Sequence, residues 1–398
     1  MHSATDFFNV QAQTTPHPLA IEVARASGSY IYDTNQKAYL DFVAGVSACT
    51  LGHCHPKLVK AVQLQAETYM HVMVYGEFIT QPAVDLCQRL GKTTHFREPM
   101  TYLVNSGTEA MEAALKLARR VTGKQEIIAM HDAYHGNTMG SMSLMDYEER
   151  LAPFRPLLSG VQHIKFNDRA GLDKITEATA AIVLESIQGG AGFILPQNEW
   201  LKELQEKASQ CKALLIVDEI QPGIARTGTF WAYQAYDFKP DMVITGKGLG
   251  GGLPIGALIA ERAHMLLFSK APKLGHITTF GGNPVVAAAA NAVLKEVKEQ
   301  ALGKAALEKE KLFRAQLKHP LIKEIRGKGL MLALILEKPE FADALVLKAL
   351  QQGLILFWLL FEKRAVRITP PLSVSKQEII DGCAIILSVL EALKEAGN

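Results

Sequence analysis

The chain has 398 residues, of which 48% are hydrophobic and 21% charged, and its formal net charge is +2. This length allows two or three domains with sizeable cores. The near-balanced charge gives no electrostatic case for a nucleic-acid partner or an anionic membrane surface. The longest apolar run, about residues 354–361, is far shorter than the roughly 20 residues that a membrane-spanning helix needs. We therefore expect a globular protein with no nucleic-acid or membrane partner.

The N-terminus and the cysteines indicate where the protein works. No basic region followed by an apolar core is visible at the N-terminus, so no secretory signal is predicted. The five cysteines are scattered and contain no CxxC pair, which favours a reducing, cytoplasmic setting.

Four potential metal ligands crowd together in one segment: Cys49, His53, Cys54 and His55. Their spacing is not that of a structural zinc site, and no second Cys/His pair follows at a suitable distance. We therefore expect no metal here, but a turn before a helix that starts near Pro56.

From about residue 100, short apolar runs alternate with stretches of helical periodicity. The predicted strands cover residues 102–104, 126–130, 180–185, 213–217 and 242–245. This alternation predicts a mostly parallel sheet with helices on both faces. In such sheets ligands bind outside the carboxyl ends of the strands, and a polar cluster follows each predicted strand.

The pattern changes after a break at residues 281–284. An alanine-rich helix is predicted to about Lys298. Beyond it we predict strands at 329–336, 354–361 and 365–369, a helix at 341–352, and a last helix that opens with the capping box Ser375 to Glu378. These elements indicate a small α+β domain. Two N-terminal strands, 30–32 and 38–40, are expected to pack against it.

We therefore expect three parts in the chain. Residues 1–46 form an N-terminal segment that packs with the small domain, residues 47–290 form the large domain, and residues 291–398 form the C-terminal small domain.

Lys247 is the only charge in the apolar, glycine-rich stretch from Met242 to Ala260. An ammonium group there loses hydration, so its pKa is expected to fall and part of it becomes a nucleophilic amine, as a Schiff-base lysine requires. A solvated loop lysine is the alternative. The stretch from Gly246 to Gly251 also fits the dinucleotide fingerprint G-x-G-x-x-G. We reject that interpretation because no helical pattern follows and no acidic residue lies about 20 positions on.

Asp218 and Arg367 are two further candidates for chemistry. Asp218 follows the predicted strand 213–217, and a buried carboxylate needs a cationic partner. A protonated pyridine nitrogen is one such partner, and a helix cap is the structural alternative. Arg367 lies in the predicted strand 365–369 and suits bidentate capture of a carboxylate, unless it is a surface residue on an edge strand.

A phosphate site is predicted where the strand 102–104 meets the next helix. The amides of Gly107 and Thr108, with the hydroxyls of Ser106 and Thr108, could cradle a phosphate there. An ordinary polar helix cap is the alternative.

Seven motifs in family order carry a resemblance to a known family. They are Asn105-Ser-Gly-Thr-Glu-Ala110, Tyr134-His-Gly136, Val217-Asp-Glu-Ile-Gln221, Arg226-Thr-Gly228, Thr245 to Gly256, Thr279-Phe-Gly-Gly-Asn-Pro284 and Arg367-Ile-Thr-Pro-Pro371. The chain resembles a class III (ω-type) aminotransferase of the acetylornithine/ornithine type, from Gly28 to the last helix. The resemblance implies the α/β fold type I of pyridoxal-phosphate enzymes: a large domain with a mostly parallel seven-stranded sheet, and a small α+β domain.

The resemblance also implies which residues bind pyridoxal 5′-phosphate. Lys247 would be the catalytic residue and the covalent anchor of the cofactor, and Asp218 would pair with its ring nitrogen. The other implied cofactor-binding residues are Ser106, Gly107, Thr108, Tyr134, His135, Gln221 and the partner subunit's Thr279. Because Thr279 would come from the neighbouring subunit, a homodimer with shared active sites is expected.

For the substrates, the resemblance implies that Arg367 binds the α-carboxylate of glutamate or 2-oxoglutarate and that Glu185 is a further substrate-binding residue. The chain departs from the family at Gly190, where other members carry a glutamate that neutralises the arginine. It also departs at Asn137, where an arginine is common, and at about Pro16, where ornithine aminotransferase has a tyrosine.

The reaction implied is transfer of an amino group from an ω-amino or ornithine-like donor, acetylornithine or ornithine foremost, to 2-oxoglutarate. The alternatives are a 4-aminobutyrate-type transaminase, a racemase or an aminomutase. A non-catalytic binding protein is disfavoured because Lys247, Asp218 and Gln221 are all present.

Overall fold

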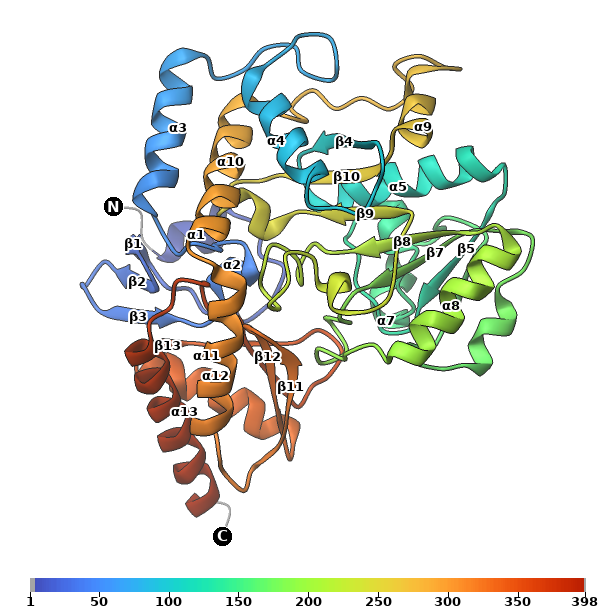
Figure 1. Ribbon diagram of the computed structural model, residues 1–398. Coiled ribbons are helices and arrows are strands. Elements are labelled where there is room, and N and C mark those ends of the chain that lie inside the picture. The colour runs from blue at the N-terminus through green and yellow to red at the C-terminus, as the bar shows by residue number, and fades with distance from the viewer. Residues whose placement is uncertain (1–3, 397–398) are drawn as a thin grey trace.

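A seven-stranded sheet forms the centre of the larger part of the molecule (Figure 1). The computed structural model describes residues 4–396, so the first three residues of the predicted 1–46 segment and the last two of the chain lie outside the described residues. In sheet order the strands are β4 (Pro99–Val104), β10 (Gly256–Glu261), β9 (Met242–Thr245), β8 (Leu214–Asp218), β7 (Thr179–Glu185), β5 (Glu126–Met130) and β6 (Val161–Ile164). Only β10 runs antiparallel to its neighbours, which confirms the predicted mostly parallel sheet.

Both faces of this sheet are buried. Leu215 and Val217 of β8 belong to one apolar core, whereas Ile216 between them belongs to a second core. Successive side chains of a strand point to opposite faces, so a strand covered on both sides reads as a continuous apolar run. Helix α5 (Gly107–Thr122) supplies residues to the second core, and α8 (Asn198–Cys211) supplies residues to the first.

Other helices surround this sheet and the N-terminal strands. They include α3 (Pro56–Thr68), α4 (Gln81–Gly91) and the long α10 (Pro284–Glu299). Helix α3 starts at Pro56, as predicted, and α10 packs against both α3 and α4. Within residues 4–396, no helix combines the length and the apolar character that crossing a membrane demands.

The C-terminal part contains a four-stranded sheet with helices packed on it. Its strand order is β11 (Ile322–Lys328), β12 (Met331–Leu336), β15 (Ala365–Ile368) and β14 (Phe357–Trp358). The helices of this part are α11 (Leu302–Gln316), α12 (Pro339–Gln351) and α13 (Lys376–Ala396). The predicted small α+β domain is thus present.

The prediction of one strand over residues 354–361 is wrong. The chain forms two short strands instead, because β13 (Leu354–Ile355) pairs with β3 (Ala38–Asp41) whereas β14 pairs with β15. The N-terminal strands β1 (Val23–Ser27) and β2 (Tyr30–Asp33) extend the β3 sheet. The prediction that the N-terminal strands pack against the C-terminal part is therefore confirmed, and Figure 1 shows them side by side.

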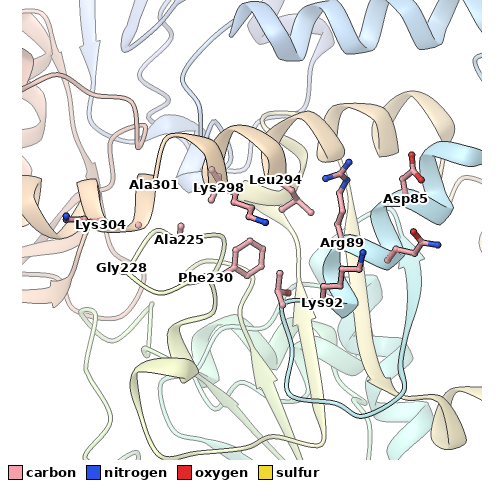
Figure 2. Close-up of a pocket in the computed structure, with 14 residues that line it drawn as sticks. Asp85, Arg89, Lys92, Ala225, Gly228, Phe230, Leu294, Lys298, Ala301 and Lys304 are labelled. Atoms are coloured by element: carbon pink, nitrogen blue, oxygen red, sulfur yellow. The ribbon is translucent and has the colours of Figure 1, made fainter.

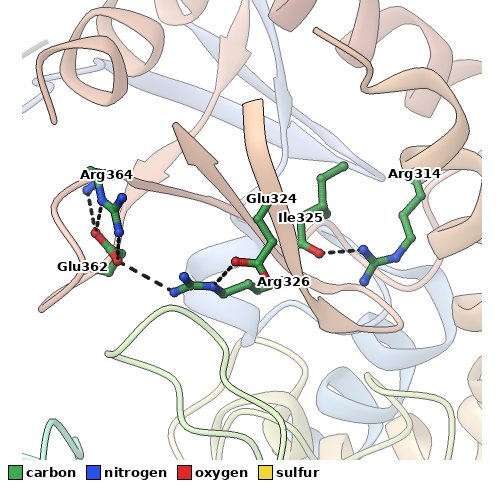
Figure 3. A network of polar contacts seen from close by, with 6 residues as sticks. All are labelled: Arg314, Glu324, Ile325, Arg326, Glu362 and Arg364. Atoms are coloured by element: carbon green, nitrogen blue, oxygen red, sulfur yellow. Dashed lines mark hydrogen bonds and ion pairs between the residues drawn. The ribbon is translucent and has the colours of Figure 1, made fainter. Parts of the chain in front are cut away.

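A loop after β14 joins the C-terminal part to the large sheet. The amide of Phe361 donates a hydrogen bond of 3.0 Å to the carbonyl of Gly190. The next residue, Glu362, forms an ion pair with Arg364 at 2.9 Å and a longer one with Arg326 of β11 at 3.7 Å (Figure 3). This network fixes the loop over the carboxyl end of β7.

Candidate active site

A cavity of about 470 Å³ lies at the carboxyl ends of β7, β8 and β9. The predicted site residues that line it are Gly107, Thr108, Tyr134, His135, Glu185, Asp218, Gln221, Lys247 and Arg367. The parallel strands bring most of them to one edge of the large sheet, whereas Arg367 reaches the cavity from β15 of the C-terminal sheet. Two predicted residues do not line this cavity. Ser106 caps α5, and Thr279 is exposed on a loop outside the cavity of its own chain.

Lys247 immediately follows the loop residue after β9 and begins a short 3₁₀ turn, η4 (Lys247–Gly250). Its backbone has a φ of 37°, in the left-handed region that side-chain-bearing residues rarely adopt. Burial lowers the pKa of its ammonium, and the charge of Arg367 adds to that effect, whereas Asp218 opposes it. The direction of this pKa change is the one expected from the sequence, because burial disfavours the charged ammonium relative to the neutral amine.

Asp218 is paired with His135 at the base of the cavity. His135 Nδ1 lies 2.8 Å from Asp218 Oδ2, and both side chains are buried. Burial opposes a charge on His135, but the hydrogen bond and the negative charge of Asp218 outweigh it and raise the pKa of the imidazole. The other carboxylate oxygen of Asp218 accepts a hydrogen bond from the amide of Ile220 at 2.9 Å.

Glu185 ends β7, and both of its carboxylate oxygens have backbone partners. The amide of Tyr134 donates to Oε1 at 2.8 Å, and the amide of Gly189 donates to Oε2. Burial raises the pKa of Glu185 to about 7, and the charge of Asp218 contributes in the same direction. The carboxyl group therefore fixes the loops after β5 and β7, and its oxygens are engaged within the protein.

The N-terminus of α5 forms the opposite end of the cavity. Ser106 Oγ accepts a hydrogen bond from the amide of Glu109, which is the capping role weighed as the alternative for this residue. The hydroxyl of Thr108 lies 2.6 Å from Ser141 Oγ and 2.7 Å from Thr138 Oγ1. The amides of a first helical turn have no partners inside the helix, so this end of the cavity suits an anion.

Glycine is required at two positions beside this helix N-terminus. A Cβ atom on Gly107 would lie 2.5 Å from the side chain of Ile220. Gly136 has a φ of +125°, and a Cβ atom there would lie 2.4 Å from the hydroxyl of Thr108. Both contacts show how closely the surrounding loops approach the end of α5.

Arg367 lies in β15 with only 6% of its surface exposed. Its Nε atom is buried and has no hydrogen-bond partner among residues 4–396, and no carboxylate of those residues forms an ion pair with it. Burial lowers the pKa of the guanidinium to about 10, which leaves it charged at neutral pH. A buried cation without an anion is costly, so this position requires a negatively charged ligand.

The three positions that depart from the family pattern differ in where they lie relative to the cavity. Asn137 lines the cavity, and its amide donates to the hydroxyl of Tyr134 at 3.2 Å. A Cβ atom on Gly190 would lie 2.6 Å from the ring of Phe361, so an aromatic side chain fills the space beside this glycine. Pro16 is exposed and does not line the cavity.

Several cavity residues were not singled out from the sequence. Val46 lines the cavity, and the next residue, Ser47, accepts a hydrogen bond of 3.3 Å from Gln221 Nε2. Phe357, Trp358 and Leu360 line the cavity from the C-terminal part. The sequence signal for them was the apolar run 354–361, which we interpreted as strand core.

A second cleft, of about 640 Å³, lies between α4, α10 and the loop around Gly228 (Figure 2). It contains none of the predicted site residues. The cations Arg89, Lys92 and Lys298 beside it lie at the C-terminal ends of α4 and α10, where the helix dipole favours positive charge. Their charge is therefore explained by the helices alone.

Comparisons with known proteins agree with this geometry. Residues 10–390 match the family Aminotransferase class-III. The acetylornithine aminotransferase of Corynebacterium efficiens is 40% identical over 384 residues, which cover 94% of this chain and 93% of that protein. The enzyme of the same name from Bacillus subtilis is 37% identical over 91% of this chain and 92% of its own length.

Solved structures show the same relationship. An ornithine aminotransferase from Toxoplasma gondii, described with partial occupancy of PLP at its active site, superimposes with a TM-score of 0.90 at 30% identity and covers 99% of this chain and 95% of that one. An aminotransferase from Bacillus anthracis gives a TM-score of 0.91 at 25% identity, with 98% of each chain covered. The chain therefore belongs to the class-III aminotransferases and is a pyridoxal-phosphate-dependent aminotransferase.

Proposed function

We propose that the enzyme transfers an amino group from an ω-amino donor of the ornithine type, N-acetylornithine foremost, to 2-oxoglutarate. The observation that carries this proposal is Arg367, a buried cation without an anionic partner in the same cavity as Lys247. Glutamate and 2-oxoglutarate both carry an α-carboxylate beside the reacting carbon, and a guanidinium binds such a carboxylate in a bidentate manner. The relatives named acetylornithine aminotransferase support this choice of donor.

The residues of the cavity fit pyridoxal phosphate. Lys247 offers a primary amine whose pKa is lowered by burial. The Asp218 carboxylate, hydrogen-bonded to His135, suits a protonated ring nitrogen, and Gln221 offers an amide for a ring oxygen. We propose that Tyr134 contacts the ring face, because it lines the same cavity. When bound, the cofactor supplies an electron sink that stabilises negative charge at the reacting carbon of the substrate.

The phosphate is proposed to bind at the N-terminus of α5. Gly107 and Thr108 line this end of the cavity, and their amides face it without helical partners. Ser106 orients the first turn as its cap. The partner subunit's Thr279 is proposed to complete the phosphate site.

Three side chains have separate roles in the proposed reaction. Arg367 holds the substrate carboxylate and so orients the rest of the substrate towards Lys247. The Nζ atom of Lys247, in its neutral form, would take the proton from the reacting carbon of the donor, and in the second half-reaction it would give a proton to the reacting carbon of the acceptor. Glu185 holds the loops that carry Tyr134 and Gly189, and thereby shapes the cavity.

We further propose that the enzyme is a cytoplasmic homodimer with two shared sites. The exposed position of Thr279 outside its own cavity supports the shared sites, and five unpaired cysteines support a reducing compartment. The domain boundaries 1–46, 47–290 and 291–398 remain part of this proposal.

Two measurements test the proposed function. Borohydride reduction of the holoenzyme followed by peptide mapping should place the cofactor on Lys247, and a label on another lysine would refute that assignment. The absorption change of the cofactor is then followed with one donor at a time: N-acetylornithine, ornithine, 4-aminobutyrate and glutamate. We expect the fastest conversion with N-acetylornithine. Conversion by 4-aminobutyrate alone, or racemisation without conversion, would favour the alternative class III reactions.

A further inference from the structure

The motif Arg226-Thr-Gly228 has no role in the proposed function, yet its arginine is a buried cation. Only 2% of Arg226 is exposed, and no carboxylate among residues 4–396 forms an ion pair with it. Burial lowers the pKa of its guanidinium to about 10, so the group is charged at neutral pH. A buried charge costs free energy, and an apolar side chain of similar volume would avoid that cost. The hydrogen-bond donors of Arg226 distinguish it from such a side chain, so their partners indicate its role.

The donors of Arg226 reach two backbone carbonyls of the C-terminal part. Its Nη1 atom donates to the carbonyls of Leu330 and Pro370, at 2.8 Å in each case. Its own carbonyl accepts a hydrogen bond of 2.9 Å from the amide of Leu330. A Cβ atom on Gly329, whose φ is +60°, would lie 2.4 Å from that carbonyl, so the two segments approach closely. Arg226 thus joins the loop after β8 to the C-terminal sheet.

Leu330 and Pro370 lie where the ladder between β12 and β15 ends. The amide of Leu336 donates to the carbonyl of Arg364 at 2.9 Å, and every second pair of an antiparallel ladder is bonded in this way. In the same register, Leu330 and Pro370 form the bonded pair that would follow the end of β15. Proline has no N–H group, so Pro370 cannot donate to the carbonyl of Leu330. Arg226 replaces both bonds of this pair, because its Nη1 atom serves the two carbonyls and its carbonyl serves the Leu330 amide.

The position of Arg367 depends on this end of the ladder. Its Nε atom has no hydrogen-bond partner within residues 4–396, so the backbone of β15 and of the following turn places the guanidinium. In that turn, the amide of Thr369 donates to the carbonyl of Phe42 at 2.7 Å, and the carbonyl of Pro370 is bonded to Arg226. Without the Arg226 donors two buried carbonyls would lose their partners, and the turn would shift to satisfy them.

The same motif is bonded to the cofactor side of the cavity. The hydroxyl of Thr227 donates to the carbonyl of Pro222 at 3.1 Å. Pro222 and Gln221 both line the cavity. The motif therefore connects the loop that carries Gln221 with the turn that follows Arg367.

We propose that Arg226 is a positioning residue for substrate binding, which holds Arg367 in place by supplying the ladder bonds that Pro370 cannot form. This inference rests on the proposed function, in which Arg367 binds the α-carboxylate of glutamate and 2-oxoglutarate. N-acetylornithine reacts through its terminal amine, and the carbon that bears this amine carries no carboxylate. The two half-reactions should therefore respond differently to a change at Arg226.

Arg226→Met tests this role in the holoenzyme, because methionine is a long side chain without donors. In single-turnover reactions followed by the cofactor's absorption, the half-saturating concentration of L-glutamate should rise about tenfold, as expected when hydrogen bonds from a charged group are lost. That of N-acetyl-L-ornithine should change by less than about twofold. Glutarate has the two carboxylates of 2-oxoglutarate but no reacting carbonyl, and calorimetry should show that it binds about tenfold more weakly.

Two double variants separate positioning from general damage. Pro370→Ala restores an N–H group that can donate to the carbonyl of Leu330, so in combination with Arg226→Met it should recover at least about threefold of the lost glutamate affinity. In an Arg367→Met background, Arg226→Met should weaken glutamate no further, because the group that it positions is absent.

Arg314→Met is the matched control. Arg314 also donates to two backbone carbonyls of the C-terminal part, those of Ile325 (Figure 3) and Gly327, but these belong to β11 and not to the turn after Arg367. The half-saturating concentrations of both donors should stay unchanged.

Equal weakening of both donors by Arg226→Met, a further loss in the Arg367→Met background, or no recovery with Pro370→Ala overturns the positioning role. If Arg226→Met yields no folded holoenzyme, Arg226→Lys takes its place with the same expected difference between donors, because an ammonium does not reproduce the guanidinium geometry. If Arg367→Met weakens glutamate and the Arg226 variants do not, only this inference falls. If Arg367→Met leaves glutamate unchanged, the proposed carboxylate site falls, and this inference falls with it.

Discussion

At the scale of single residues, the site is a set of buried charges that balance one another. Asp218 is held by His135, whereas Arg367 has no anion from the described part of the chain. A buried charge that has a partner within the protein needs no ligand, whereas an unpaired buried cation attracts one. The Asp218–His135 pair therefore suits a permanent contact with a cofactor, whereas the unpaired Arg367 suits a substrate that binds and is released in each cycle.

Asp218→Asn is predicted to impair chemistry rather than cofactor attachment. The amide cannot keep a ring nitrogen protonated, so the single-turnover rate should fall by several orders of magnitude. Borohydride should still attach the cofactor to Lys247. Asp241→Asn is a suitable control because Asp241 accepts a hydrogen bond from the amide of Leu215, at the end of β8 that is opposite to Asp218. An Asp218→Asn rate within tenfold of wild type, about 1.4 kcal/mol in barrier, would contradict this role.

Gly190→Glu introduces the glutamate that related enzymes carry at this position, but its side chain would clash with Phe361, so a second substitution is needed. Its Cβ atom would lie 2.6 Å from the Phe361 ring, so the single variant should melt at a lower temperature, with overpacking costing about 1–3 kcal/mol. Phe361→Ala should relieve the clash. In the double variant the new carboxylate should pair with Arg367 and slow the reaction with glutamate more than with 4-aminobutyrate.

Phe361→Ala alone is the matched control for that selectivity. Equal slowing of both donors in the double variant would show that residue 190 does not control access to Arg367.

At the scale of elements, the turn before α3 is bonded to the N-terminal strands. His53 Nε2 lies 2.9 Å from Asp41 Oδ2 at the end of β3, and the backbone of His53 pairs with Gly28. The hydrogen bond to Asp41 and contact with Cys49 raise the pKa of His53 to about 10, although burial opposes this change. The turn that crowds cysteines and histidines in the sequence thus has a structural explanation.

His53→Gln is predicted to give a pH-dependent loss of stability. A histidine whose pKa is raised on folding stabilises fully below its unfolded pKa, about 6.5, and loses this contribution as pH rises through about 10. The loss of unfolding free energy in urea should therefore be larger at pH 6 than at pH 10. His17→Gln, at an exposed position, serves as the control. An equal loss at both pH values would rule out a charged pair.

At the scale of the whole molecule, exposed apolar side chains gather on two segments, 70–79 and 274–280. They are Met70, Met73, Phe78, Ile79, Leu274, Ile277 and Phe280, of which Ile79 is 91% exposed. Apolar surface of this kind marks an association site, and Thr279 lies in the second segment. Both observations favour a second copy of the chain as the partner.

Ile79→Glu combined with Phe280→Glu is predicted to yield a monomer that binds the cofactor weakly, because two charges would be buried at the interface and the partner's Thr279 would be lost. Light scattering and the cofactor's absorption measure the two effects. Val10→Glu, at a position 84% exposed on α1 (Ala4–Val10), should change neither. A wild-type protein that scatters as a monomer would contradict the shared site.

The sequence by itself determined five of the seven strands of the large sheet and most residues at their carboxyl ends. Buried parallel strands are continuous apolar runs, and the polar residue that ends each run is local information, as at Asp218 and Lys247. The strands β6, β10 and β11 were missed because their local patterns are weaker than the pairing that selects them.

Only the tertiary structure decided how distant groups meet. The run 354–361 divides between two sheets because β3 pairs with its first part and β15 with its second, and this division places Phe357 directly opposite Arg367. The pairing of His135 with Asp218, and of Phe361 with Gly190, joins residues far apart in the chain. Such contacts depend on how separate elements pack together, and no local sequence pattern encodes that packing.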